Sequence, residues 1–127
     1  MSRKKQTKRY DQNIIEALKK LPSPIYDRKH NIYIYANDNR ARSNETRFEH
    51  IAKQYHELKV RDIEVIPDGI NRYCYFSKSK NIKDTYYYYI VRKGEDKGFI
   101  RVAIQLNSQN RKAYIKTIYV LYRIKEK

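Results

Sequence analysis

The chain has 127 residues, which suits a single domain built around one modest hydrophobic core. Lysine and arginine number 29 against 14 aspartates and glutamates, so the formal net charge is +15. Such an excess favours a polyanionic partner, with nucleic acid ahead of an anionic membrane surface or an acidic protein. A single cysteine excludes a disulfide framework, and no apolar run is long enough to cross a membrane.

The N-terminal residues 1–9 carry the basic run SRKKQTKR, which predicts an arm that is either solvated or in contact with phosphates. The same stretch lacks the apolar segment of a signal peptide. We therefore expect a cytoplasmic protein.

Residues 10–70 are predicted to be the helical part of the domain. Asp11 is placed to cap a helix over 11–21, and the alternation NIYIYAN predicts a short strand over 31–37. The spacing of apolar residues in ETRFEHIAKQYHEL predicts a second helix over 45–58, opened by Ser43 or Asn44. A helical turn over 60–66 precedes the turn signal PDG.

Residues 71–124 are predicted to form a β-sheet. Four strand-like segments (72–78, 85–93, 98–106 and 112–124) are joined by the short polar connections SKNIKD, GEDKG and NSQNR. Connections of this kind suit hairpins. The expected fold class is α+β, with N-terminal helices packed on a four-stranded antiparallel β-meander.

Four consecutive tyrosines, residues 86 to 89, lie in the second of these strands. Successive side chains of a strand point to opposite faces, so two rings can fill the core while two stack on unpaired bases. We assign the stacking face to Tyr86 and Tyr88. The alternative is that all four are strand-forming residues that fill a half-buried sheet.

The residues that could carry chemistry favour metal-free cleavage of RNA. The three histidines, at positions 30, 50 and 56, lack metal-ligand spacing, and the carboxylates are scattered, so neither a metal nor another cofactor is expected. Cleavage by the RNA 2′-hydroxyl needs only a base, an acid and cations around the phosphate. Histidine, arginine, lysine and tyrosine supply all of these.

The order of elements resembles the barnase–EndoU–colicin–RelE superfamily of small ribonucleases, in its branch of phage and mobile-element toxins. The resemblance is carried by HIAKQYHEL, IEVIPDGI and the final IKTIYVL, and it covers roughly residues 31 to 124. It implies that His50 acts as general base or acid and that Arg47 touches phosphate. It further implies that Arg101 steadies the transition state, and that Thr117 bonds a phosphate oxygen beside Tyr119.

Further contacts with nucleic acid are expected from a second set of residues. His56 matches the second histidine of the family pattern and could serve either structure or substrate binding, whereas the lysines of the set are general phosphate contacts. The set is Lys53, His56, Lys78, Tyr86, Tyr88 and Lys116. The competing interpretation is that His50, Arg47 and Arg101 are ordinary surface residues.

The sequence thus predicts a metal-independent endoribonuclease that cleaves cytosolic tRNA or mRNA as a toxin or phage effector. One alternative is a non-catalytic, basic nucleic-acid-binding protein or a phage-encoded inhibitor of host nucleic-acid machinery. A further hypothesis, which can coexist with the first, is that the basic surface is an interface with an acidic partner such as an antitoxin or immunity protein.

Overall fold

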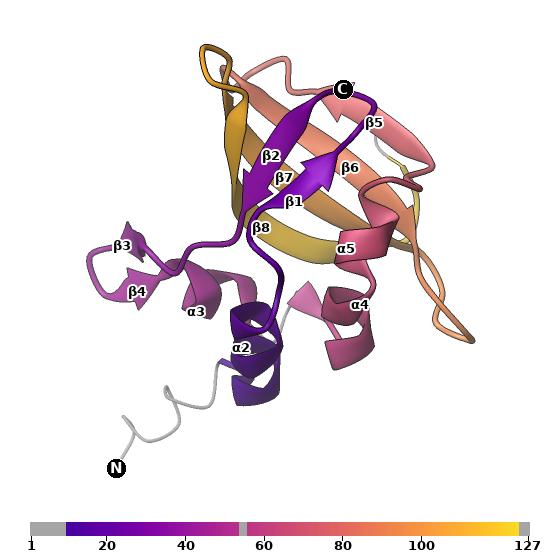
Figure 1. The fold of residues 1–127 in the computed structure, drawn as a ribbon. Coiled ribbons are helices and arrows are strands. Elements are labelled where there is room, and N and C mark those ends of the chain that lie inside the picture. Colours follow the sequence, from indigo (N-terminus) through magenta and orange to yellow (C-terminus); the bar gives the residue numbers. More distant parts are fainter. Residues whose placement is uncertain (1–9, 54–55, 125–127) are drawn as a thin grey trace.

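The computed structural model describes residues 10–53 and 56–124, and its main feature is a six-stranded curled sheet with the order β1-β2-β8-β7-β6-β5 (Figure 1). The basic arm expected at residues 1–9 lies outside the described residues. The strands of this sheet are β1 (Ile25–Asp27), β2 (Ile32–Tyr35), β5 (Tyr75–Lys78), β6 (Thr85–Val91), β7 (Phe99–Asn107) and β8 (Lys112–Leu121).

The prediction of an α+β fold with a four-stranded meander is wrong, because two strands from the N-terminal part join the sheet. Strands β5 to β8 pair antiparallel in chain order, but β2 pairs parallel with β8 and β1 pairs antiparallel with β2. The result is a mixed α/β fold. The physical reason is that β2 offers Ile32 and Ile34 to the core, and β8 has a free edge that accepts it.

The curl of the sheet brings its two ends together (Figure 1). The Asn71 side chain, just before β5, accepts a hydrogen bond from the Arg28 amide (3.0 Å) and donates one to the Tyr26 carbonyl (2.8 Å). The Tyr88 hydroxyl on β6 donates to Asp27 on β1 at 2.5 Å. These contacts fasten β1, at one edge, to the strands at the other edge.

The helices are short. Helix α2 (Gln12–Lys19) is capped by Asp11, as the sequence predicts, and α4 (Val60–Glu64) and α5 (Ile66–Gly69) form two successive turns. Helix α3 (Arg47–Ile51) has five residues, so the prediction of a helix over 45–58 is wrong. Within the described residues, no helix combines the length and apolar character needed to cross a membrane.

Helix α3 begins later than expected, because residues 45 and 46 form a strand, and it ends at Ile51 with Ala52 as its C-cap. Glu45 and Thr46 form β4 (Glu45–Thr46), which pairs with β3 (Arg40–Arg42) in a hairpin that projects beside α3 (Figure 1). Thr46 then caps α3 through a capping box with Glu49, whose side chain accepts from the Thr46 amide at 3.0 Å. Residues 54 and 55, once expected in this helix, lie outside the described residues.

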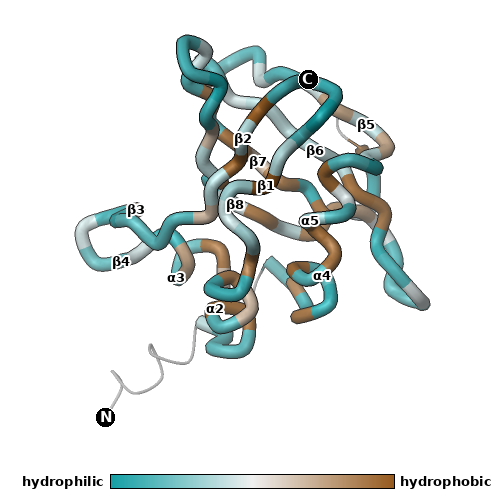
Figure 2. Tube along the Cα trace, viewed as in Figure 1, coloured by the Kyte–Doolittle hydropathy of each residue, from teal (hydrophilic) through white to brown (hydrophobic). Residues whose placement is uncertain are grey.

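The core lies between the helices and one face of the sheet. Figure 2 shows hydrophobic residues along β7, β8 and the helices, and hydrophilic colour along the β3–β4 hairpin. Isoleucines dominate the interior, and Tyr88 is buried among them. Fully burying one such side chain is worth about 1.5–3 kcal/mol. Members with no more than 2% exposure include Ile14, Leu18, Ile34, Ile51, Ile63, Ile66, Ile100, Val102, Ile104 and Ile118.

Candidate active site

The end of α3 and strand β8 border a pocket of about 360 Å³, lined by His50, His56, Thr117, Tyr119 and Val120. Four of the five residues are ones that the sequence singled out. The pocket therefore brings His50 and His56 together with Thr117 and Tyr119.

A β-bulge between β7 and β8 explains why Thr117 and Tyr119 are available to this pocket. Ile115 pairs with Ile104, but Thr117 pairs with Ala103, so Lys116 is the extra residue. Without the bulge, Ile115 and Thr117 would share a face. With it, Ile115 and Ile118 enter the core, and Thr117 and Tyr119 lie on the opposite face.

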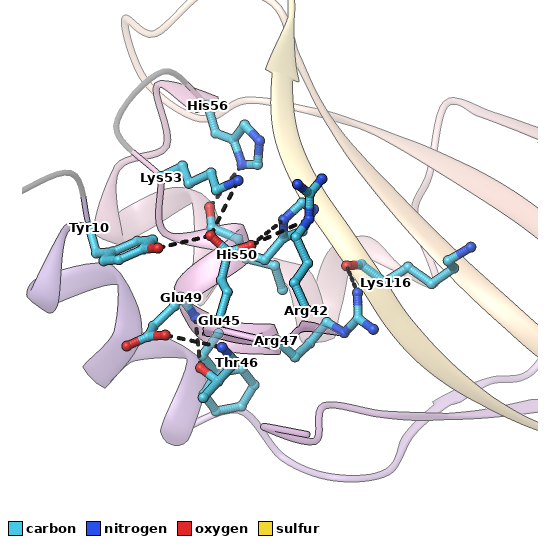
Figure 3. Close-up of polar contacts among 12 residues, drawn as sticks. Tyr10, Arg42, Glu45, Thr46, Arg47, Glu49, His50, Lys53, His56 and Lys116 are labelled. Carbon is cyan, nitrogen blue, oxygen red and sulfur yellow. Dashed lines mark hydrogen bonds and ion pairs between the residues drawn. The ribbon is translucent and has the colours of Figure 1, made fainter. Parts of the chain in front are cut away.

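Glu45 organises the polar side of the site (Figure 3). Its carboxylate is buried and accepts hydrogen bonds from the Tyr10 hydroxyl (2.9 Å) and from Lys53 Nζ (3.2 Å). Its second oxygen lies 3.2 Å from His50 Nδ1 and 3.8 Å from Arg42 Nε. Four side chains, one from β3, one from α3 and two from outside the helices and strands, thus converge on one carboxylate.

These contacts fix the protonation states around Glu45. Burial raises the pKa of Glu45, but the hydrogen bonds from Tyr10, Lys53 and His50 together outweigh burial, so its pKa is lowered. Burial also lowers the pKa of His50; the bond to Glu45 opposes this, and the positive charge of Lys53 adds to it. Because the ionised carboxylate accepts from Nδ1–H, the neutral ring carries its lone pair on Nε2.

His56 is held in the same tautomer. Its Nδ1 lies 3.0 Å from the carbonyl oxygen of Ile51, to which it donates, so Nε2 carries the lone pair of the neutral ring. Its ring stands at 84° to that of His50, with 5.8 Å between centroids, and lies 5.8 Å from the Tyr119 ring. Burial lowers the pKa of His56, against the opposing effect of the Ile51 carbonyl.

Arg101, on β7, lies next to the pocket and is surrounded by three tyrosine side chains. It donates to the Tyr119 hydroxyl, and its guanidinium carbon lies 3.8 Å from the centre of the Tyr87 ring and 5.6 Å from that of Tyr89. Burial raises the pKa of Tyr119, while the charge of Arg101 opposes the rise. The tyrosines and Arg101 therefore form one cationic wall on the outer face of the sheet.

Two polar atoms at this wall are buried without a partner. Among the residues that the structure describes, Arg101 Nε and Thr117 Oγ1 lack hydrogen bonds. Leaving such a group unsatisfied costs about 1–3 kcal/mol, so a partner that reached either atom would gain a favourable contact. A donor on a cation and a hydroxyl suit an anionic oxygen.

Arg47 and Lys116 lie next to this pocket but not in its lining. Arg47 donates to the Lys116 carbonyl (3.0 Å) and to Asn39 Oδ1 (3.3 Å), so its guanidinium follows β8 away from His50 (Figure 3). Its charge still contributes to the lowered pKa of His50. The two side chains belong to a second, adjoining pocket.

The remaining predicted contacts lie elsewhere. Tyr88 is 0% exposed and Tyr86 stacks on Phe76 at the core face, so the stacking role expected of Tyr88 is withdrawn. The tyrosines on the Arg101 side are instead Tyr87 and Tyr89, the latter also 0% exposed. Lys78 lies over the Tyr86 ring and belongs to β5, which is separated from β8 by the two strands β7 and β6.

Glu45 and Tyr10 are the site residues that the sequence did not reveal. Glu45 has the sequence context of an ordinary first-turn helix residue, and only its burial in β4 shows its role. The sequence of β6, however, does indicate which face of the strand lies on the core. Ile90 shares a face with Tyr86 and Tyr88, which marks that face as the core side.

In the part of the chain that the structure describes, no three histidine, cysteine, aspartate or glutamate side chains form a group able to hold a metal ion. Comparisons with protein-family models, curated proteins and solved structures found no match to the chain.

Proposed function

We propose that this protein is a metal-independent endoribonuclease of the barnase–EndoU–colicin–RelE type, acting on cytosolic RNA as a toxin or mobile-element effector. The observation that carries the proposal is the pocket where two histidines face Thr117 and Tyr119 beside Arg101. The net charge of +15 supports a polyanionic substrate. An acidic antitoxin or immunity protein is the matching partner class.

The chemistry divides among these groups as follows. His50 Nε2 takes the proton of the ribose 2′-hydroxyl, whose oxygen then forms a bond to phosphorus. The bond from phosphorus to the 5′-oxygen breaks, and that oxygen takes a proton from the second histidine, His56. Arg101 and Thr117 bind the phosphate oxygens that gain negative charge.

The lowered pKa of His50 fits its role as the base, whereas the lowered pKa of His56 means that this ring must gain its proton when substrate binds. An imidazole that is neutral near pH 7 is ready to act as a base, which suits His50. A bound phosphate places negative charge next to both rings and raises their pKa values, because an opposite charge stabilises the protonated form. Substrate binding therefore favours uptake of a proton from solvent by His56, and this is the proton that His56 later donates to the 5′-oxygen.

The test is incubation of the purified chain with a panel of tRNA and mRNA in EDTA, followed by mass analysis of the new ends. We expect 2′,3′-cyclic phosphate ends, and their formation should fall at least about a hundredfold in His50→Ala, the usual contribution of one acid–base group. DNA of the same sequence should resist cleavage, because it lacks the 2′-hydroxyl.

His30→Gln is the matched control. His30 lies between β1 and β2, packs on Phe76 of β5 (4.1 Å between ring centroids) and contacts Asp27 through Nδ1 (2.8 Å). It does not line the histidine pocket, so its replacement should leave cleavage intact. Melting curves check that both variants fold. Tight, salt-dependent RNA binding with no product, unchanged in His50→Ala, would reject the enzyme and favour the non-catalytic alternative.

A further inference from the structure

A second pocket, of about 540 Å³, adjoins the first along β8. Residues 114 to 116 line it, whereas Thr117, Tyr119 and Val120 line the histidine pocket. Its volume lies in the range of about 300–1,000 Å³ that is usual for small-ligand sites. The two pockets therefore lie one after the other along β8.

Helix α3 also joins the two pockets. Arg47 lines the second pocket and His50 lines the first, and residues three apart on a helix are neighbours on its surface. Arg47 and Lys116 bring two positive charges to the side of the second pocket nearest the histidines. A phosphate chain bound at His50 would thus continue towards these cations.

The far part of the second pocket carries several side-chain amides. Gln105 and Asn107 come from β7, and Gln109 from the turn that follows. Asn107 Oδ1 accepts from the backbone N–H of Gln109 (3.0 Å), and Asn39 Oδ1 accepts from Arg47 Nε (3.3 Å). Because these bonds use the oxygen of each asparagine side chain, the NH₂ donors remain for a ligand. Amide side chains offer the paired donors and acceptors that read base edges.

An aromatic wall completes the pocket. Tyr114 is 44% exposed and tilts against Tyr35, with 6.0 Å between ring centroids. An exposed ring next to amides and cations is the combination on which an unpaired base stacks. Asp84 also lines the pocket, and a carboxylate is an acceptor suited to an amino group of a base.

We infer that this second pocket binds the base of the nucleotide next to the cleaved bond, so that unpaired RNA is selected by base identity. The inference rests on the proposed function and extends it. A base held in a helix keeps its Watson–Crick edge occupied, so only single-stranded segments or loops can fill the pocket. The pocket, rather than the histidines, then sets the sequence preference.

The test is an NMR titration of the ¹⁵N-labelled chain with the four nucleoside 3′-monophosphates, with ribose 5-phosphate as the base-free probe. Nucleotides should shift the backbone amides of Asn107 and Gln109 and the side-chain amide of Gln105, and one base should bind tightest. Ribose 5-phosphate should shift only signals around Arg47 and Lys116. The titration needs no turnover, so it is independent of whether RNA is cleaved.

Two variants sharpen the result. Tyr114→Ala should weaken nucleotide binding by about tenfold, the usual effect of losing one base stack, and Gln105→Ala should reduce the preference among bases. Tyr26→Ala is the control, because Tyr26 is 40% exposed on β1 but does not line the pocket. Equal shifts from nucleotides and ribose 5-phosphate, or none at residues 105 to 109, would overturn the inference.

Discussion

Replacing Glu45 by Gln removes one charge from the centre of the candidate active site and keeps its shape. The carboxylate accepts from Tyr10, Lys53 and His50, and its side chain is 6% exposed. A glutamine retains one acceptor oxygen, so we expect two charge-assisted contacts to be lost. At about 1.5 kcal/mol each, the free energy of unfolding should fall by about 3 kcal/mol.

Thermal unfolding measures this loss. For a chain of this size 1 kcal/mol corresponds to about 4 °C, so the midpoint should fall by about 12 °C at pH 7. The pKa of Glu45 is lowered from 4.5, so its contribution is complete above pH 4.5 and is lost as pH falls through the folded-state pKa. The difference between wild type and Glu45→Gln should therefore shrink in acid.

The same substitution should change the titration of His50, which is measured from its ring proton signals. Glu45 raises the pKa of His50, whereas Lys53 and burial lower it. With the carboxylate gone, the pKa of His50 should fall further. If the proposed function holds, the acid limb of kcat/KM should move to lower pH by the same amount.

Glu49→Gln is the control, because it removes the same charge from the neighbouring helix α3. Glutamine at this position still completes the capping box with Thr46, so stability and the His50 pKa should hardly change. An unchanged melting midpoint in Glu45→Gln, or a His50 pKa that rises, would refute the role given to Glu45.

Two further predictions concern buried polar contacts away from the pocket. Tyr88→Phe should cost about 1–3 kcal/mol in urea denaturation, because the Asp27 carboxylate loses its 2.5 Å donor, and it should leave RNA affinity unchanged since the ring is 0% exposed. Asp62→Asn should lower the free energy of unfolding by about 3–5 kcal/mol, because Arg92 becomes a buried charge without its counter-ion. Arg92 donates to Asp62 at 3.0 and 2.8 Å in the intact protein. A loss below about 1 kcal/mol would contradict this.

Local patterns predicted several elements because their cause is local. The alternation in β7 follows burial of Ile100, Val102 and Ile104, and the Asp11 cap needs only the next two residues. The sheet order was not predictable in this way. Tyr33 pairs with Lys112, although most of the chain separates them in sequence. Nothing in the sequence of either segment indicates that the two strands pair.

The candidate site was predictable to the extent that residue type carries chemistry. His50, His56, Thr117 and Tyr119 meet in one pocket, yet the bulge that turns Thr117 outward depends on the pairing of β7 with β8. The apolar spacing of Phe48 and Ile51 suggested a long helix, but it could not show where that helix begins. Because the start of the helix was misplaced, the sequence did not identify Glu45 as a residue of the site.

The order in which the ribosome makes the segments bears on when the protein can act. Strands β1 and β2 leave the ribosome early, but β2 must wait for Lys112–Leu121 before it has a neighbour to pair with. The same late segment supplies Thr117 and Tyr119. A nascent chain that stops short of β8 therefore has neither a complete sheet nor the histidine pocket. If the proposed function holds, cleavage of RNA cannot begin before the last strand has been made and paired.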